Sequence, residues 1–580
     1  MPNRSLRVQA SFRGALLVFL FAVLLFNTVQ PATVSAAGAC PSGRRCAFIP
    51  LVKSPAQQSG DLSIHNIEVT QAVQDANNSI PLVAGRNTLL RVYARTTGTT
   101  TPMSNVKISV TANNGSFMLT ESPRAVSATV PLNYNRANLQ STINITLPAS
   151  WMTGDVSLTV RLDPDNQIHE TSESNNTLTK KFTFQQVAPL QIKIVPIKYV
   201  NLKDGRTYAA PTKDSIRDWI LRTYPVPDVQ ISWHAPFTFT GDLSRGDEFR
   251  RLLSQVTELK NTEKAHSSQV YYALVPTTSS GHTWFYGGVA GVGWIGARAA
   301  VGLDVSGTSG EIAAHEIGHN LGLDHSPCGV PAGTNPSFPY SDGSIGQLGI
   351  DTYAGVLYPT TTKDVMSYCS PKWVSDYTYR SLFNAQRAVG AYVQAANVQA
   401  AQRGLLVRAV IDPSGVQLQP AYVLPGPVEA QIEAGEFLVE TLDAQGAVLS
   451  QTPVRAYEAA AEDNVPYAAI NTLIPLPDSP AASFHLVKDG QVVASQALHV
   501  PEPQPLMNGQ SLQSADLQII STRSDLEAEL AQINRPAMVQ YSTDGGASWT
   551  TLGLDITIET IPDLPEENVI YQVLASETWQ

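Results

Sequence analysis

Charged residues are scarce in this chain: Asp, Glu, Lys and Arg make up 15% of its 580 residues, and the formal net charge is -11. The sequence contains no cluster of Lys and Arg, so it lacks the basic face that binding to phosphates requires. We therefore expect no nucleic-acid partner. Hydrophobic residues reach 43%, which excludes a globally disordered chain.

Long apolar runs are missing too, except near the N-terminus. Residues 15–26 are apolar, follow three arginines and precede small residues at 34–37. This pattern predicts a secretory signal peptide over residues 1–37, because a run of about twelve residues is too short for a membrane span of about twenty. We expect a secreted, extracellular protein that does not span a membrane after processing.

Cysteine is rare, with four residues in the chain. Outside the cytosol, four cysteines are consistent with two disulfides. Cys40 and Cys46 are near neighbours and could close one small loop. The alternative for Cys40 is a lipoprotein anchor. The preceding Ala37-Gly-Ala is only faintly similar to a lipobox, because it lacks the large aliphatic residue and lies far from the apolar run.

The length of the chain predicts three to five domains, at roughly 150 residues each. After a linker at 38–60, short alternating segments separated by Gly, Asn, Asp and Pro predict a two-sheet β-sandwich over 61–186. Residues 187–402 mix buried-strand patterns with helical stretches. Strand patterns return in two small β-domains, at 403–504 and 505–580.

The last of these domains contains Ser542–Trp549, which matches the Asp-box pattern of sialidases and other β-proteins. That box is usually a folding element in a β-hairpin, and a single copy makes no propeller. The segment therefore predicts a hairpin and not a glycosidase.

Histidine is also sparse, yet three of the ten residues fall between positions 315 and 325. His315 and His319 are one turn apart on a helix, so both imidazoles can reach one ion, and Glu316 projects beside them. Gly322 lets the chain leave the helix sharply, because a residue without Cβ tolerates the left-handed conformation. His325 can then return as a third ligand. An amphipathic helix with incidental histidines explains the apolar positions but not this clustering.

Three neutral imidazoles are the ligand set of a catalytic zinc ion that keeps an open position. Such an ion lowers the pKa of water to about 7. Glu316 would then act as the general base, which takes the proton of the attacking water and passes it to the leaving amine. The motif therefore predicts one catalytic Zn²⁺.

A second motif follows at Asp364-Val-Met366-Ser-Tyr368-Cys369. The extended histidine motif followed by a methionine turn resembles the metzincin zinc endopeptidases. The resemblance implies that Met366 forms a hydrophobic floor under the histidines. It also implies that Tyr368 ligates the resting zinc and then hydrogen-bonds the developing oxyanion. If the turn lies under the zinc, Cys328 comes close to Cys369, and we expect a disulfide between them; zinc ligation by cysteine is the rival interpretation.

The metzincin resemblance covers about residues 187–402. It implies a multidomain protein in which an α/β (α+β) metzincin-like catalytic domain is flanked by all-β sandwich domains. The end of the first sandwich resembles the close of the immunoglobulin-like CARDB domains found in microbial surface and secreted proteins. A Ca²⁺ site built from Asp163, Asp165 and Glu170 is conceivable there, but nothing supports it and polar turns without metal are much commoner.

The function that these features predict is that of a secreted zinc-dependent endopeptidase acting on extracellular proteins or glycoproteins through a zinc-activated water. The flanking β-domains would bind a cell-surface or glycan target, or position the substrate. The alternative is a surface adhesin or carbohydrate-binding protein whose metal domain is secondary or inactive. An inactive relic would be expected to lose Glu316 or a histidine first, and all four residues are present.

Overall fold

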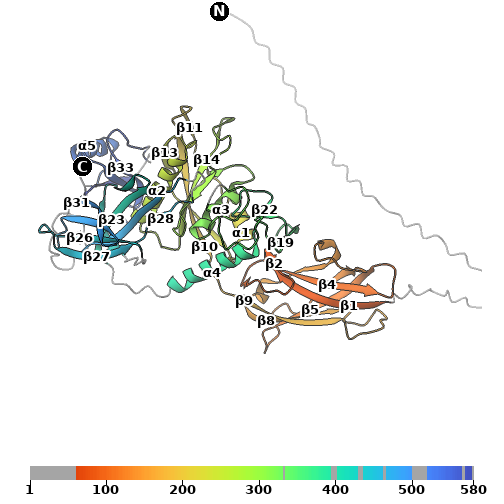
Figure 1. Ribbon diagram of the computed structural model, residues 1–580. Helices are drawn as coiled ribbons and strands as arrows, with labels where there is room; N and C mark the ends of the chain where they lie inside the picture. The colour runs from red at the N-terminus through yellow and green to blue at the C-terminus, as the bar shows by residue number, and fades with distance from the viewer. Residues whose placement is uncertain are drawn as a thin grey trace, which may run out of the picture. The chain divides into compact units, whose positions relative to one another are not determined.

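The computed structural model describes residues 60–330, 333–393, 401–428, 435–460, 465–477, 479–498, 519–562, 564 and 569–577 (Figure 1). The expected signal peptide, the linker, Cys40 and Cys46 lie outside this range. Contacts group residues 58–580 into one compact unit. Within the described residues, no helix combines the length and the apolar character that crossing a membrane requires.

The expected fold class is wrong. The structure is mostly β, with 43% strand and 14% helix, and no metzincin-like α/β catalytic domain is evident in the residues that it describes. The helices are few in the described residues, and their lengths range from the 7 residues of α1 (Arg217–Thr223) to the 18 of α4 (Asp376–Val393). Strands account for most of the regular structure because β-branched and aromatic residues recur along the whole chain, including both ends of the described range.

The first module is a sandwich of two sheets (Figure 1). One sheet has the order β1-β4-β7 and the other β3-β9-β8-β5-β6. Alternate residues of these strands point inward and form one apolar core around the fully buried Trp151. The strands are β1 (Asp61–Thr70), β3 (Leu82–Val83), β4 (Leu89–Thr97), β5 (Met103–Asn113), β6 (Arg124–Val130), β7 (Ile143–Thr146), β8 (Gly154–Leu162) and β9 (Thr177–Gln185), with short 3-10 turns at Leu139–Ser141 and Ala149–Trp151.

A mixed sheet of order β11-β10-β14-β18-β17 forms the centre of the second module, and β12 and β13 also pair with β10. Strands β10, β14 and β18 are parallel, whereas β17 is antiparallel to β18 and ends the order. All seven residues of β14 are buried, as expected for a strand covered on both faces. The strands are β10 (Leu190–Asn201), β11 (Arg206–Tyr208), β12 (Val229–Trp233), β13 (Phe237–Gly241), β14 (Val270–Pro276), β17 (Gly291–Gly293) and β18 (Ala299–Asp304).

Helices cover both faces of this sheet. Helix α2 (Gly246–Thr262) shares one core with side chains of one face. Helices α1 and α3 (Ser309–Asn320) share another core with the opposite face. Helix α4 (Asp376–Val393) follows. The small strands around them are β15 (Thr278–Ser279), β16 (His282–Thr283), β19 (Leu348–Asp351), β20 (Val356–Tyr358), β21 (Lys363–Asp364) and β22 (Lys372–Trp373).

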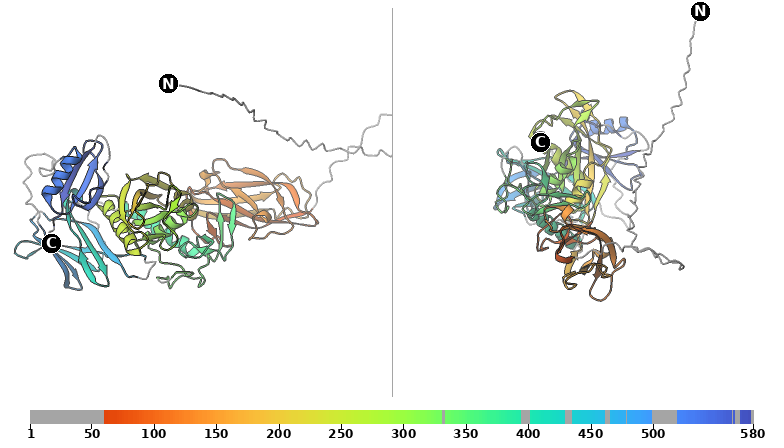
Figure 2. Two further views of the ribbon diagram at one scale, coloured as in Figure 1. Left: turned by 90° about the horizontal axis from the view of Figure 1, so that it is seen from above. Right: turned by 90° about the vertical axis from the view of Figure 1, so that its right-hand side faces the viewer.

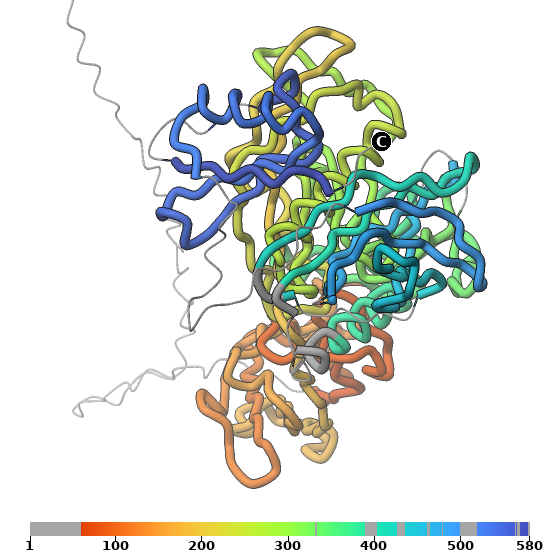
Figure 3. Tube along the Cα trace, turned by 90° about the vertical axis from the view of Figure 1, so that its left-hand side faces the viewer, coloured from red at the N-terminus to blue at the C-terminus, as the bar shows by residue number. Residues whose placement is uncertain are grey.

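Two further β-modules follow helix α4, and Figures 2 and 3 trace them in teal and blue. The first has sheets of order β24-β23-β29-β28, with β25 on β23, and β27-β26-β30-β31; the second has β33-β32-β34 and helix α5 (Arg523–Ile533). The strands are β23 (Ala401–Asp412), β24 (Gly415–Leu418), β25 (Tyr422–Val428), β26 (Phe437–Leu442), β27 (Val448–Val454), β28 (Tyr457–Glu458), β29 (Ala468–Pro475), β30 (Ser483–Lys488), β31 (Gln491–Ala497), β32 (Ala537–Ser542), β33 (Thr550–Ile556) and β34 (Ile570–Ala575).

The Asp-box segment forms the turn between β32 and β33. The Asp544 carboxylate accepts hydrogen bonds from the Ser542 hydroxyl, at 2.7 Å, and from the Ser548 amide, at 2.9 Å. These bonds hold the pKa of Asp544 well below its usual range. The carboxylate is occupied in closing the hairpin, as expected for a folding element.

The sandwich is joined to the second module by hydrogen bonds as well as by the chain. Strand β2 (Val73–Gln74) pairs with β19, and β19 pairs with β20. Arg86 is 1% exposed, and its guanidinium donates to the carbonyls of Arg222, Tyr224 and Val226, which lie at the C-terminal end of α1. A cation at that end of a helix also interacts favourably with the helix dipole.

Replacing Arg86 should weaken the contact between the sandwich and the second module. We expect Arg86→Ala to lower the free energy of unfolding by about 1.5–3 kcal/mol, the usual loss when hydrogen bonds to a charged group are removed. Urea unfolding monitored by tryptophan fluorescence measures the change. Arg95→Ala, at an exposed position of β4, is the matched control. Equal midpoints for the two variants would contradict the role given to Arg86.

Candidate metal centre

Helix α3 carries the first two histidines in the core of the second module. Ala313, Ala314 and Ile317 face the sheet and are fully buried, which fixes the rotation of the helix. His315 and His319 then lie on one face, and they are 5% and 1% exposed. The helix ends where Gly322 adopts a φ of +88°, a left-handed conformation that glycine accepts without strain.

The turn after helix α3 brings His325 close to the first two histidines. The amides of Gly322 and Leu323 donate to the carbonyls of His319 and Gly318, so the last turn closes on itself. His325 follows and is 3% exposed; its amide donates to the Gly333 carbonyl at 3.2 Å. The ligand atoms of the three histidines lie within 4.8 Å of one another, and no other such group of His, Cys, Asp and Glu occurs in the part of the chain that the structure describes.

Backbone carbonyls orient two of the rings. The Nδ1 atom of His315 lies 2.9 Å from the Val365 carbonyl, and that of His319 lies 2.7 Å from the Leu323 carbonyl. A carbonyl oxygen only accepts, so each Nδ1 carries the proton and each Nε2 presents a lone pair. Such second partners fix the tautomer of histidine ligands in metalloproteins.

The two Nε2 atoms of His315 and His319 face each other at 3.2 Å. Two lone pairs at this distance repel unless a cation lies beside both. Nitrogens bound tetrahedrally to zinc at about 2.0–2.1 Å are separated by roughly 3.3 Å, so the spacing fits this ion. Burial and the neighbouring His325 lower the pKa of His319 to about 3, and burial likewise holds the pKa of His315 well below its usual range. Both rings are therefore neutral, as metal ligands must be.

The methionine turn lies directly under the helix. A Cβ atom at Gly318 would lie 2.5 Å from the Met366 sulfur, so the glycine is what allows the turn to approach. The Met366 carbonyl accepts from the Ser326 amide at 3.0 Å. The expected disulfide between Cys328 and Cys369 is confirmed; it closes a sequence separation of 41 residues and links the His325 segment to the turn.

The Tyr368 hydroxyl also lies at the cluster, 3.1 Å from Nε2 of His325. Its amide donates to the Cys328 carbonyl at 3.0 Å, which sets the position of the residue beside the disulfide. The structure thus places this tyrosine next to the histidine nitrogens.

Glu316 is 3% exposed and lies between helix α3 and the edge strand β17. A Cβ atom at Gly291 would lie 2.5 Å from Oε1 of Glu316, and one at Gly293 would lie 2.6 Å from its carbonyl oxygen. Gly291 and Gly293 are therefore required for the close approach of β17 to Glu316. Asn320 strengthens the same contact, because its amide nitrogen donates to the Trp294 and Ala299 carbonyls.

One supporting residue was not anticipated from the sequence. Asp364 is fully buried, and its two carboxylate oxygens accept from the amides of Met366, at 2.8 Å, and Ser375, at 2.9 Å. The carboxylate therefore shapes the methionine turn from within. Its position two residues before Met366 was the only indication in the sequence.

The acidic turn of the sandwich does not gather into a calcium site. Asp163 accepts from the amides of Gln167 and Ile168, while Asp165 pairs with Lys107. Glu170 accepts from the Leu62 amide at 2.7 Å and from the Asn176 side chain. Each carboxylate is bound to a different protein partner, which is the arrangement of a polar turn.

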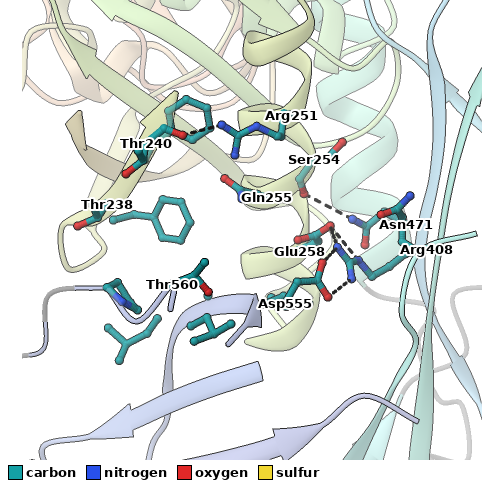
Figure 4. Close-up of a pocket in the computed structure, with 18 of the residues that line it drawn as sticks. Thr238, Thr240, Arg251, Ser254, Gln255, Glu258, Arg408, Asn471, Asp555 and Thr560 are labelled. Atoms are coloured by element: carbon teal, nitrogen blue, oxygen red, sulfur yellow. Dashed lines mark hydrogen bonds and ion pairs between the residues drawn. The ribbon is translucent and has the colours of Figure 1, made fainter. Parts of the chain in front are cut away.

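A large cavity lies away from the histidines. It has a volume of about 920 Å³ and is lined by β13, α2 and the C-terminal modules (Figure 4). Arg408, which is 5% exposed, bridges Glu258 of α2 and Asp555 of β33, at 2.7 Å to each. The Arg408 guanidinium thus faces two carboxyl groups from two different modules, and burial raises the pKa of Glu258 to about 7, so this cluster ties three modules together at the cavity.

Comparisons with known proteins match two parts of the chain. The family model described as Peptidase M66, a metallopeptidase family, matches residues 252–376, and the CARDB family model matches residues 61–180. The first match contains the three histidines, Glu316, Met366 and Tyr368. The chain therefore contains a region similar to a metallopeptidase family and a region similar to CARDB domains, whose function is unclear.

Solved structures are similar only at a low level. The CARDB domain of the PF1109 protein from Pyrococcus furiosus, solved in complex with di-metal ions, is 15% identical with a TM-score of 0.15, and the match covers 22% of this chain and 94% of that one. The alpha-2-macroglobulin of E. coli is 10% identical with a TM-score of 0.14, over 89% of this chain and 24% of that one. No curated protein matches the chain. With such low scores we draw nothing from these likenesses.

The facing nitrogens make metal binding directly testable. We expect the purified protein to hold about one equivalent of a divalent transition metal, and His319→Ala to lose most of it, because two ligands rarely retain the ion. Elemental analysis after dialysis measures the stoichiometry. His282→Ala, at an exposed histidine of β16, should keep the metal. Full metal content in His319→Ala would show that the cluster is not the binding site.

Proposed function

We propose that this protein is a secreted zinc-dependent endopeptidase that hydrolyses peptide bonds of extracellular proteins or glycoproteins. The observation that carries the proposal is the pair of Nε2 atoms of His315 and His319, 3.2 Å apart, with both Nδ1 atoms bound to carbonyls and the Glu316 carboxylate on the same helix. The family match over residues 252–376 supports a peptidase, and hence a protein substrate.

His315, His319 and His325 would hold the ion. A zinc ion bound by three neutral imidazoles supplies a Lewis acid that polarises a peptide carbonyl and lowers the pKa of water to about 7. The buried position of the cluster supports this ligand set, since no carboxylate of the described residues competes for a place among the three rings. The carbonyls of Val365 and Leu323 keep each lone pair directed inward.

Glu316 would be the general base. Its carboxylate takes a proton from the attacking water and delivers it to the nitrogen of the leaving amine. The glycines of β17 leave the carboxylate room at the strand, and burial keeps other water away from it. Tyr368 would donate a hydrogen bond to the oxyanion, since its hydroxyl lies beside His325.

The substrate would bind in extended form along β17, the edge strand next to Glu316. Pairing along a sheet edge supplies hydrogen bonds from the main chain of any peptide, whatever its sequence. The sandwich and the C-terminal modules would position the substrate or attach the enzyme to a cell-surface or glycan target. The adhesin interpretation gives no account of the close fit between Glu316 and Gly291.

The central test separates chemistry from metal binding. Glu316→Ala should lower kcat/KM for cleavage of reduced, carboxymethylated casein by about 10² to 10⁴, the usual contribution of a general base, while zinc content and thermal stability stay close to the parent. Glu311→Ala, in the first turn of the same helix, should retain activity. Undiminished cleavage by Glu316→Ala would exclude its role as base, and a parent protein that binds zinc but cuts nothing would favour the adhesin.

The fit of β17 against Glu316 gives a second test. Gly291→Ala places a methyl group where the Glu316 carboxylate now lies, so the carboxylate must move. A displacement of about 1 Å can cost roughly 10²-fold in rate. We therefore expect kcat to fall by about that factor with zinc content unchanged. Val289→Ala, in the same segment, is the control, and wild-type kcat in Gly291→Ala would contradict the proposed position of the base.

A further inference from the structure

The two oriented histidines of the metal centre depend on different kinds of contact. The Nδ1 atom of His319 is bound by the Leu323 carbonyl, only 4 residues further along the chain. The Nδ1 atom of His315 is bound by the Val365 carbonyl, which is 50 residues away. A local turn therefore orients His319, whereas His315 is oriented only while the segment of Val365 is held against helix α3. Whatever holds that segment also holds this ligand.

The segment of Val365 is held through its neighbour Asp364. The Asp364 carboxylate accepts hydrogen bonds from the Met366 amide, at 2.8 Å, and from the Ser375 amide, at 2.9 Å. The backbone of Asp364 also pairs with that of Trp373, because these two residues are partners in the parallel pair of β21 and β22. The position of Val365 therefore depends on where Trp373 and Ser375 lie.

Trp373 is 1% exposed and is in contact with several segments. Its ring stacks on Tyr358 with ring centroids 4.2 Å apart. A Cβ atom at Gly349 would lie 2.4 Å from Cδ1 of Trp373, so this side of the ring is also in close contact. The indole nitrogen donates to the Ala72 carbonyl at 2.8 Å, and Ala72 lies between β1 and β2 of the sandwich. The sandwich thus binds a ring that has little room to move.

The contact around Ala72 is part of a shared core. The Ile350 amide donates to the same Ala72 carbonyl at 2.7 Å, and β2 pairs with β19 beside it. Residues of the sandwich and of the second module form one buried cluster here, namely Ala72, Val73, Ile80, Ile345, Trp373, Val374 and Tyr379. Close-packed interiors transmit displacements, because they contain few voids. A shift of the sandwich at this cluster must therefore displace Trp373.

We propose that Trp373 is a positioning residue of the metal centre, and that the sandwich sets the zinc affinity of the histidines through it. The series of contacts is short. The Ala72 carbonyl binds the Trp373 indole, Trp373 pairs with Asp364, and the carbonyl of the next residue, Val365, binds His315. This proposal rests on the proposed function and names a regulation of its metal site. The sandwich is then a structural part of the metal centre.

Zinc titration of the whole protein tests the role of Trp373. Trp373→Phe removes the indole N–H but keeps an aromatic ring. Loss of a group that supports a histidine ligand typically weakens metal binding by about 10- to 100-fold, so we expect the Kd for zinc to rise by that factor, measured in competition with a chromophoric chelator. After loading with cobalt(II), the visible absorption of the variant should also differ from that of the parent, because the geometry of the ligands has changed.

A second tryptophan provides the matched control. Trp151 is fully buried in the core of the sandwich, and its indole nitrogen donates to the Thr120 carbonyl at 2.7 Å. Trp151→Phe therefore removes the same kind of hydrogen bond away from β22. It should destabilise the fold to a similar extent but keep the parent Kd for zinc within about twofold. A parent-like Kd in Trp373→Phe, or an equal rise in both variants, would overturn the proposal.

Two valines test the sandwich side of the contact. Val73 is 2% exposed and belongs to the cluster that contains Trp373, whereas Val92 is fully buried in the core of the sandwich itself. We expect Val73→Ala to raise the Kd for zinc by about 3- to 30-fold, the usual range for substitutions that alter the coupling between two sites. Val92→Ala loses the same atoms and should bind zinc like the parent. Equal zinc affinities of the two variants would overturn the part assigned to the sandwich.

Hydrogen exchange on the parent protein gives a result that does not depend on a variant folding. Coupling between two sites is reciprocal, so zinc must stabilise the contact that sets its affinity. The Ile350 amide, which donates to Ala72, should exchange at least about threefold more slowly with zinc bound, whereas the Leu119 amide, bonded within the sandwich, should not change. Equal exchange of Ile350 in both states would overturn the proposal. A parent that binds no zinc would refute the proposed function and this proposal with it, whereas zinc binding that is indifferent to Trp373 would refute this proposal alone.

Discussion

The second module depends on one constraint. The Nε2 atoms of His315 and His319 face each other at 3.2 Å inside the protein. Neutral lone pairs do not attract, so packing alone gives no reason for this arrangement. It persists because a backbone carbonyl binds the Nδ1 atom of each ring. The Val365 carbonyl of the methionine turn binds His315, and the Leu323 carbonyl after the helix binds His319. The site is therefore organised by backbone acceptors, and each acceptor needs its own support.

That support comes from contacts between segments that are distant in sequence. Asp364 is buried and accepts the amides of the methionine turn. The Cys328 to Cys369 disulfide closes a 41-residue separation and ties the turn to the segment that carries His325. Because Gly318 has no side chain, Met366 can approach helix α3. Because Gly291 has none, the Glu316 carboxylate can approach β17. Polar bonds, one covalent link and two missing side chains thus act together with the apolar core to which Leu323, Val365 and Met366 belong.

The β-modules contribute backbone to the same region. Strand β2 of the sandwich pairs with β19, which lies in the long segment between His325 and the methionine turn. In the first C-terminal β-module, residues 458–460 pair with residues 293–295 and so extend the sheet beyond β17. These pairings are among the contacts that group residues 58–580 into a single compact unit.

The sequence by itself determined that His315, His319 and His325 come together, because their spacing and the need for Gly322 are local properties of one helix and one turn. It also predicted the sandwich strands, the Asp-box hairpin and the pairing of Cys328 with Cys369. Only the tertiary structure decided the rest. The mostly β character, the burial of Asp364, the fit of Gly291 against Glu316 and the bridge between Trp294 and Ala459 all depend on contacts between residues distant in sequence. No local pattern records which distant strand completes an edge, since any extended segment offers the same amides and carbonyls.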